Sequence, residues 1–215
     1  MTATAETGVS QGALMAVPLD LTTPNAAAKL ERILTEIDAY PERWRTPVTP
    51  DRVRGEFMRI LHHPEHLTWE VWREGELVGI LLLWRIAPGV DALFHFLFFD
   101  KNLVGKIRLL RRFLRYCFED LGFQRLTMEV PEDVEKLISF VRRKLSFRYE
   151  GEDAVKSHPL LTHLERATGA SGNPHIWVAR MGSRRERAHW RDGTWLDLVC
   201  LRLTAPEFLE QYPGG

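Results

Sequence analysis

The segment that most constrains the fold spans residues 77–121. Two almost continuously apolar runs, 77–86 and 92–99, are separated by a Pro-Gly turn and followed, after a second short turn, by a helical pattern over 105–121. Apolar runs without alternation are typical of central strands that helices cover on both faces. The helical pattern places its apolar residues on one stripe, and Gly122 suits a helix C-terminus. The segment therefore predicts strand, strand and helix within one α/β core.

Further elements flank this unit on both sides. Upstream, helical spacing predicts one helix opening at Pro24-Asn25 and a second ending before Pro64, then a strand over 67–73. Downstream, the pattern predicts a strand over 125–130, a helix ending at Leu145, a strand starting at Phe147 and a final strand over 195–203. This order predicts an α/β fold with a mixed sheet.

The domain organisation follows from length and composition. A chain of 215 residues with 45% hydrophobic content can bury one sizeable core. We expect a flexible N-terminal arm over 1–22 and a single domain over 23–215. Residues 156–191 are polar and rich in Gly, Arg and His, and the segment is too long for an ordinary connection. It predicts an insertion, either with some structure around 176–178 or as a mobile loop.

Charge and apolar patterning argue against several classes of partner. Lys+Arg and Asp+Glu both number 29, so no broad electrostatic attraction to nucleic acid or to an anionic membrane is indicated. No run approaches the roughly 18 apolar residues that a membrane span needs. Cys117 and Cys200 lie in apolar stretches, which favours reduced core thiols in a cytoplasmic protein.

Four sequence phrases occur in a characteristic order after Phe99. They are F-E-D-L-G-F at 118–123, R-L-T-M-E-V-P at 125–131, R-K-L-S-F-R-Y-E-G at 143–151 and R-D-G-T-W-L-D at 191–197. Together they resemble the core of the GNAT (GCN5-related N-acetyltransferase) superfamily, and they are most similar to divergent members encoded by bacteriophages and prophages. The resemblance implies a central mixed, mostly antiparallel twisted sheet flanked by helices, with acetyl-CoA as cosubstrate and an amine as acceptor.

The turn at 101–106 is where this resemblance places the cofactor. Outward N–H groups followed by a helix N-terminus form a natural cradle for the pyrophosphate of acetyl-CoA. The family pattern Q/R-x-x-G-x-G/A fits with one glycine, Gly105, while Val104 and Lys106 fill its small positions. A distortion in the preceding strand would let the pantetheine arm lie beside backbone 96–99, whose aromatic side chains also suit plain core packing. The implied cofactor contacts are Phe98, Phe99, Lys101, Asn102, Val104, Gly105, Lys106 and Ile107.

Two residues are candidates for the chemistry of amine acetylation, which needs a neutral amine and a polarised acyl carbonyl. His95 stands alone in an apolar strand and can act as a base near neutral pH, or it can be a hydrogen-bonded structural histidine. Asp100 can orient an amine or cap the turn. The family's acidic tyrosine falls on Arg142, and 134–145 contains no tyrosine. The resemblance predicts an acetyl-CoA-dependent N-acyltransferase, and the missing tyrosine leaves the alternative of a weak or inactive GNAT-fold protein with a structural or binding role, for example in a phage particle.

The remaining clusters carry simpler interpretations. His62, His63 and His66 lack accompanying ligands at a defined spacing, so we expect no metal. The arginines of 108–115 fit a solvated helix face better than a nucleic-acid surface. The acceptor amine, whether small molecule or protein, is not specified by any motif. The family often pairs through its late strands, so the resemblance is compatible with a homodimer.

Overall fold

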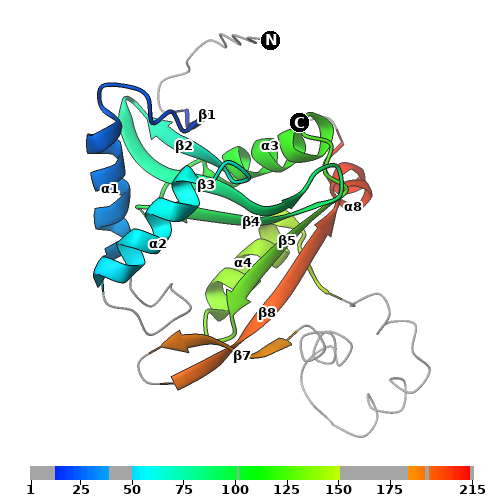
Figure 1. Ribbon diagram of the computed structural model, residues 1–215. Helices are drawn as coiled ribbons and strands as arrows, with labels where there is room; N and C mark the ends of the chain where they lie inside the picture. Colours follow the sequence, from blue (N-terminus) through cyan, green and yellow to red (C-terminus); the bar gives the residue numbers. More distant parts are fainter. Residues whose placement is uncertain (1–12, 39–49, 101, 151–183, 192–193, 214–215) are drawn as a thin grey trace, which may run out of the picture.

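The computed structural model describes residues 13–38, 50–100, 102–150, 184–191 and 194–213. Its helices and strands follow the order that the sequence predicted, with two additional strands and one additional helix (Figure 1). The elements are β1 (Met15–Pro18), α1 (Ala26–Asp38), α2 (Pro50–His62), β2 (Leu67–Arg73), β3 (Glu76–Ala87), β4 (Asp91–Phe98), α3 (Lys106–Glu119), β5 (Arg125–Pro131), α4 (Glu135–Leu145), β6 (Arg148–Tyr149), β7 (Arg184–Arg191), β8 (Thr194–Thr204) and α8 (Ala205–Gln211). The additional elements are β1, β7 and α8.

One sheet of eight strands organises these elements, in the order β1-β2-β3-β4-β5-β8-β6, with β7 also pairing with β8. The β4–β5 pair is parallel, and every other pair in the described residues is antiparallel. The parallel pair is joined by α3, as a crossover between parallel strands requires. The sheet is therefore mixed and mostly antiparallel, as expected.

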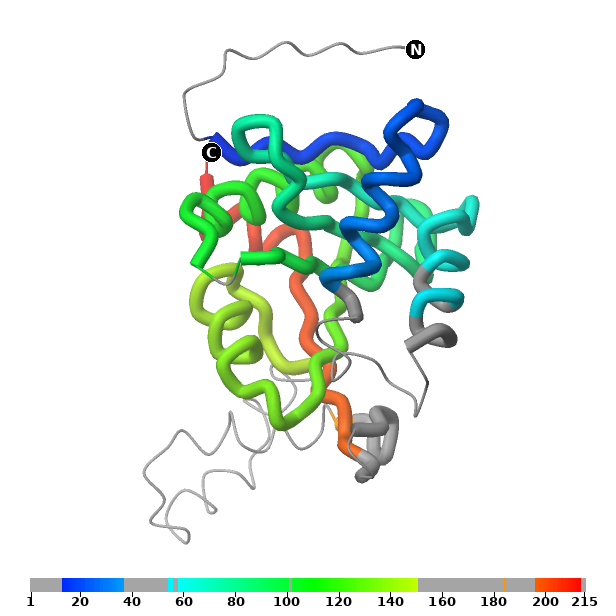
Figure 2. Tube along the Cα trace, turned by 90° about the vertical axis from the view of Figure 1, so that its left-hand side faces the viewer, coloured from blue at the N-terminus to red at the C-terminus, as the bar shows by residue number. Residues whose placement is uncertain are grey.

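Helices cover both faces of the sheet. In Figure 2, α1 and α2 (blue and cyan) lie on one side, and α3 and α4 (green to yellow-green) lie on the other. The larger core lies under α3 and α4, where Phe94 of β4 stacks on Phe113 of α3 with ring centroids 5.7 Å apart. A smaller cluster packs under α1 and α2 and includes Ile33, Leu34 and Ile80. The double covering explains why β3 and β4 are apolar on both faces.

Helix α3 matches its predicted amphipathic pattern. Most of the predicted stripe is buried, including Leu110, Phe113, Leu114, Cys117 and Phe118. The helix ends before Gly122, whose φ of +74° is the left-handed conformation that glycine adopts without strain. None of the helices in the described ranges is long and apolar enough to cross a membrane.

The expectation of a flexible arm over 1–22 is wrong for its second half. Residues Met15–Pro18 form β1, which pairs antiparallel with β2 from Met15–Trp72 to Pro18–Trp69. Leu14, just before the strand, is 8% exposed and belongs to the main core. A four-residue strand is too short to show a clear alternation. It forms by pairing with β2, more than fifty residues away, and local sequence does not report such pairing.

The predicted insertion over 156–191 also ends earlier than expected. Residues Arg184–Arg191 form β7, which pairs antiparallel with β8 from Arg184–Val199 to Arg191–Thr194. The sequence of this strand, R-R-E-R-A-H-W-R, shows no apolar alternation. The pairing is made by backbone groups, which composition does not report. The expected structure around 176–178 lies outside the described residues.

Candidate functional site

Strands β4 and β5 pair at one end and separate at the other. The paired residues are Asp91 with Arg125, Ala92 with Leu126 and Leu93 with Thr127, and the strands run on without pairing. The resemblance implied a distortion in β4 at this place, but β4 pairs with β3 without interruption from Leu93 to Phe98. The irregularity lies in β3, between Trp84 and Ala87. The two strands therefore leave an opening between their C-terminal halves without a bulge in β4.

The turn after β4 presents the N-terminus of α3 beside this opening. The N-cap residue is Gly105, whose φ of +84° is left-handed and which offers no side chain to cap the helix. The Leu109 N–H donates to the Gly105 carbonyl at 3.0 Å, so α3 begins directly at this glycine. The N–H groups of a first helical turn have no carbonyl partner four residues earlier. This geometry suits an anionic group.

Asp100 helps to build that turn. Its carboxylate accepts a hydrogen bond from the Asn102 N–H at 2.7 Å, and its carbonyl accepts one from the Leu103 N–H at 3.3 Å. Such a local bond is a common way for an aspartate to fix a turn. Of the two roles considered for Asp100, the geometry supports capping.

The other predicted cofactor contacts differ in how far their side chains are exposed. Val104 is 81% exposed, so its side chain lies in solvent rather than over the first turn of α3. The Lys106 ammonium lies 5.8 Å from the ring centroid of Phe140 on α4, which places a cation between the two helices. Phe98 is buried in the core and Phe99 packs beside Arg32 of α1. Ile107 is half-buried, and Lys101 lies outside the described residues.

His95 lies on the face of the sheet that carries α1 and α2. Phe94, Phe96 and Phe98 point into the core under α3 and α4, so the alternate position 95 faces the other way. The His95 ring meets the edge of Trp84, with ring centroids 5.2 Å apart. His95 is two positions beyond Leu93, the last residue of β4 that pairs with β5, so its side chain stands at the opening.

Glu129 is a functional candidate that the sequence reasoning missed. It is two positions beyond Thr127, the last residue of β5 that pairs with β4, so it faces the opening from the strand opposite His95 and on the same side of the sheet. It is one of the buried charged residues, 5% exposed. The alternation that turned Leu126, Met128 and Val130 towards the core was visible in the sequence, and it already placed residue 129 on the other face.

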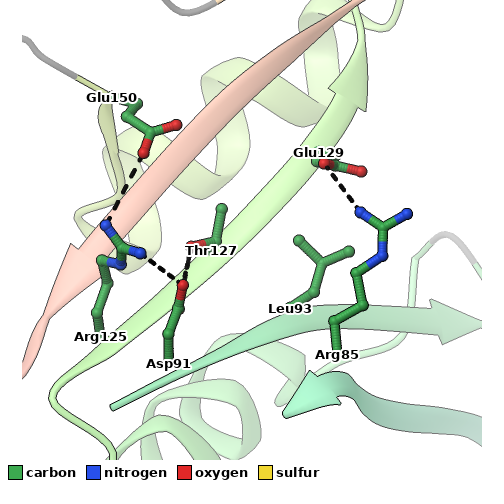
Figure 3. Close-up of a pocket in the computed structure, with 7 residues that line it drawn as sticks. All are labelled: Arg85, Asp91, Leu93, Arg125, Thr127, Glu129 and Glu150. Carbon is green, nitrogen blue, oxygen red and sulfur yellow. Dashed lines mark hydrogen bonds and ion pairs between the residues drawn. The ribbon is translucent and has the colours of Figure 1, made fainter. Parts of the chain in front are cut away.

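A charged cavity of about 130 Å³ lies on the same face (Figure 3). Leu93 and Thr127, the last residues of the β4–β5 pairing, contribute to its lining. Its charged lining residues are Arg85, Asp91, Arg125, Glu129 and Glu150. At one end, Arg125 lies 2.7 Å from Asp91, and the Thr127 hydroxyl donates to Asp91 at 3.1 Å. The hydrogen bond to Asp91 raises the pKa of Arg125 despite partial burial. At the other end, Arg85 reaches Glu129 across Leu93 at 3.6 Å.

Position 142, where the resemblance placed an acidic tyrosine, is occupied by an arginine. Arg142 places its guanidinium 4.1 Å from the ring centroid of Tyr149, so it packs onto β6. Ser146, the C-cap residue of α4, adopts a left-handed φ of +68°. Its hydroxyl lies 2.8 Å from the Tyr212 hydroxyl. The described part of α4 therefore supplies no phenol to the opening.

The histidines and arginines that the sequence singled out lie elsewhere. The rings of His63 and His66 stack 4.3 Å apart after α2, and the described residues contain no group of three or more His, Cys, Asp or Glu side chains suited to a metal. On α3, Arg115 pairs with Glu119 at 2.7 Å, and Arg111 donates to the Lys144 carbonyl. Arg108 and Arg112 are exposed.

Comparison with known proteins identifies the fold. No family model and no curated protein matches the sequence. Solved structures of spermidine N-acetyltransferase SpeG from Vibrio cholerae do match, among them a point mutant with a TM-score of 0.62 and 13% identity, covering 92% of this chain and 97% of that one. Its complex with CoA and spermine gives a TM-score of 0.60 and 13% identity, over 91% and 98% of the two chains. A chimera of the enzyme with hSSAT also matches, with a TM-score of 0.60.

These structures establish the fold of this chain. At 13% identity over nearly the whole length of both proteins, the likeness lies in the arrangement of strands and helices. The chain has the GNAT fold, with a mixed, mostly antiparallel sheet flanked by helices, as the sequence resemblance implied.

Proposed function

We propose that this protein is an acetyl-CoA-dependent N-acetyltransferase that acts on an amine. The observation that carries the proposal is the opening between β4 and β5, which lies directly beside the uncapped N-terminus of α3. In this proposal the extended thioester arm would lie where β4 and β5 part, and the pyrophosphate would lie at the N-terminus of α3. One structural neighbour, the Vibrio cholerae enzyme, was solved with CoA and spermine, which supports a cofactor and an amine of these classes.

The cofactor contacts in this proposal come from the turn and the end of β4. Backbone groups of residues 96–99 would line the thioester arm, and residues 102–107 would hold the phosphates, with Lys101 completing the set. The Lys106 ammonium, close to Phe140, adds a positive charge between α3 and α4. Val104 does not oppose phosphate binding, because its side chain is directed into solvent.

The chemistry would take place at the mouth of the opening. The acceptor ammonium first gives up one proton to water. The neutral amine nitrogen then attacks the thioester carbonyl, a C–N bond forms, and the C–S bond breaks to release CoA. His95 would accept the proton that the amine loses, and Glu129, on the facing strand, would orient the amine. The thiolate of CoA can leave without a protein acid, because alkyl thiols have a pKa near roughly 8.5 and take a proton from water. This route needs no tyrosine at position 142.

Binding of acetyl-CoA is the first test. Acetyl-CoA at about 100 times its Kd should raise the free energy of unfolding by about 2.7 kcal/mol, measured as a thermal shift. The variant Gly105→Ala should lose this shift, because a side chain at φ +84° reshapes the turn. The matched control is Gly122→Ala at the opposite end of α3, where φ is +74° and an added Cβ meets no atom within 4 Å. Both variants should lose about 1 kcal/mol of stability, but only the control should still respond to acetyl-CoA.

Turnover tests the chemical assignment. Release of CoA in the presence of an amine panel should fall strongly in His95→Ala, while the acetyl-CoA thermal shift remains. Unchanged turnover would remove His95 from the mechanism. The absence of a thermal shift at millimolar acetyl-CoA would contradict the proposal that this protein is an acetyl-CoA-dependent enzyme.

A second candidate is a GNAT-fold protein with a structural or binding role, for example in a phage particle. The observation that favours it is Arg142, which packs on Tyr149 where enzymes of the family often carry their acidic tyrosine. The example of a phage particle comes only from the resemblance of the phrases at 118–131 and 143–151 to phage and prophage members. This candidate predicts no CoA release with any amine, even if acetyl-CoA binds.

A further inference from the structure

Among the described residues, the charged cavity holds three ion pairs. Arg125 lies 3.9 Å from Glu150, and the other two pairs, Arg125–Asp91 and Arg85–Glu129, differ in how completely they are made. Arg125, Asp91 and Thr127 form a closed group in which Asp91 receives hydrogen bonds from both partners, at 2.7 and 3.1 Å. The pair of Arg85 and Glu129 is longer, at 3.6 Å, which exceeds the usual length of a charge-assisted hydrogen bond. The Arg125–Asp91 pair ties β4 to β5 where they are in register. The Arg85–Glu129 pair lies at the opening and is only loosely made.

The two members of the loose pair also differ in their surroundings. The Glu129 side chain is 0% exposed, whereas the Arg85 side chain is 57% exposed. A buried carboxylate depends strongly on a nearby cation, because it has lost its hydration. A guanidinium that is already more than half exposed to water loses little interaction energy when it turns away from the carboxylate into solvent. Arg85 is therefore the partner that can leave.

The backbone of β3 aims Arg85 at this position. Arg85 has a left-handed φ of +48° and lies in the irregularity between Trp84 and Ala87, opposite β4. This conformation costs a residue other than glycine about 1 kcal/mol or more. Bulges of this kind redirect a side chain. The guanidinium then passes Trp84, 5.6 Å from its ring centroid, and crosses Leu93 towards β5 (Figure 3).

We infer that Arg85 is a displaceable counter-ion, which occupies the place of the acceptor's ammonium at Glu129. The acceptor is then a cationic amine that enters the cavity, forms a shorter ion pair with Glu129 and releases the Arg85 guanidinium to solvent. The lining carries three carboxylates and two guanidinium groups, so its net charge is negative and becomes more negative when the Arg85 guanidinium turns away, which favours a cationic ligand. Arg85 sets specificity, because an uncharged acceptor cannot compete with it. The inference rests on the proposed function, which makes the bound amine the acceptor of the acetyl group.

Binding of a simple amine without acetyl-CoA tests the inference. The probe is n-butylamine, with butan-1-ol as its uncharged analogue, titrated by calorimetry against the full chain. Arg85→Gln should bind n-butylamine about fivefold more tightly than the wild type, since an exposed arginine in an ion pair contributes up to about 1 kcal/mol. Arg85→Lys keeps a competing cation and should bind as the wild type does. Glu129→Gln should weaken binding at least tenfold, and butan-1-ol should bind none of the proteins detectably.

The control for overall charge is Arg112→Gln, an exposed arginine on α3, which should leave the affinity unchanged. Equal or weaker binding by Arg85→Gln, or equal strengthening by Arg112→Gln, would overturn the inference. If Arg85→Gln fails to fold by circular dichroism, Arg85→Met provides the same comparison. Acetyl-CoA thermal shifts on the same variants separate the two claims. A protein that binds n-butylamine in the predicted order but not acetyl-CoA would contradict the proposed function and leave this inference standing.

Discussion

Gly79 on β3 allows β3 and β4 to approach closely where β4 reaches the opening. A Cβ placed on Gly79 would lie 2.5 Å from the Leu97 carbonyl oxygen, 2.9 Å from Phe98 Cδ1 and 3.2 Å from Phe98 Cα. Two of these atoms belong to the backbone, so a rotamer change cannot relieve the contacts. The variant Gly79→Ala should therefore move the backbone of Leu97 and Phe98, which we propose to contact the thioester arm.

The size of the effect follows from these distances. Ordinary van der Waals contact begins at 3.4 Å, so the Leu97 oxygen must retreat by about 0.9 Å from its 2.5 Å separation. Overpacking of this kind costs roughly 1–3 kcal/mol. Taking about 2 kcal/mol, the Tm should fall by roughly 4–8 °C for a chain of this size. Affinity for acetyl-CoA should fall as well, because the displaced backbone lines the opening.

The assay compares Gly79→Ala with Gly55→Ala by thermal unfolding, with and without acetyl-CoA. Gly55 is exposed in α2, and an added Cβ meets nothing within 4 Å. Gly55→Ala should stabilise the protein by roughly 0.5–1 kcal/mol, because alanine restricts the unfolded chain and favours helix. A Tm for Gly79→Ala within about 1 °C of the wild type would refute the claim that the β3–β4 approach requires glycine.

Three further predictions concern the rest of the structure. Ser146→Ala should be about 1 kcal/mol less stable than Ser146→Gly in urea unfolding, because both lose the hydroxyl contact with Tyr212 but only alanine keeps the strain of φ +68°; equal stabilities would contradict this. Burial tends to raise the pKa of Glu207, but hydrogen bonds from Thr204 and Arg202 hold it below its ordinary value of 4.5. The ionised Glu207 side chain should contribute about 1 kcal/mol to the free energy of unfolding through the capping box of α8. This contribution should be present above pH 4.5 and be lost as pH falls through the lowered pKa of Glu207. Below pH 5, the urea midpoint of Glu207→Gln should therefore decline less with falling pH than that of the wild type. Burial also raises the pKa of the Cys117 thiol, and Cys200 is 2% exposed, so an aromatic disulfide reagent should label neither thiol until the protein is unfolded; labelling of the native protein would contradict the buried positions.

Much of the site could be placed from the sequence, because its backbone scaffold is local. The apolar runs of β3 and β4, the stripe of α3 and the single glycine before it all lie within 77–121, where periodicity reports the secondary structure directly. That segment located the turn, the N-terminus of α3 and His95. Asp100 illustrates the limit, since only the structure shows that its carboxylate accepts a hydrogen bond from the Asn102 N–H.

The sequence by itself determined most of the helices and strands between residues 26 and 149, and which face their residues take, because those properties depend on neighbours along the chain. Only the tertiary structure decided which strands lie side by side and where they separate. It brought β1 to β2 and β7 to β8, and it left β4 and β5 unpaired beyond Leu93. It also brought Arg85 from an irregular position in β3 to the buried Glu129 of β5. Contacts between residues distant in sequence depend on register and packing, which no local pattern records.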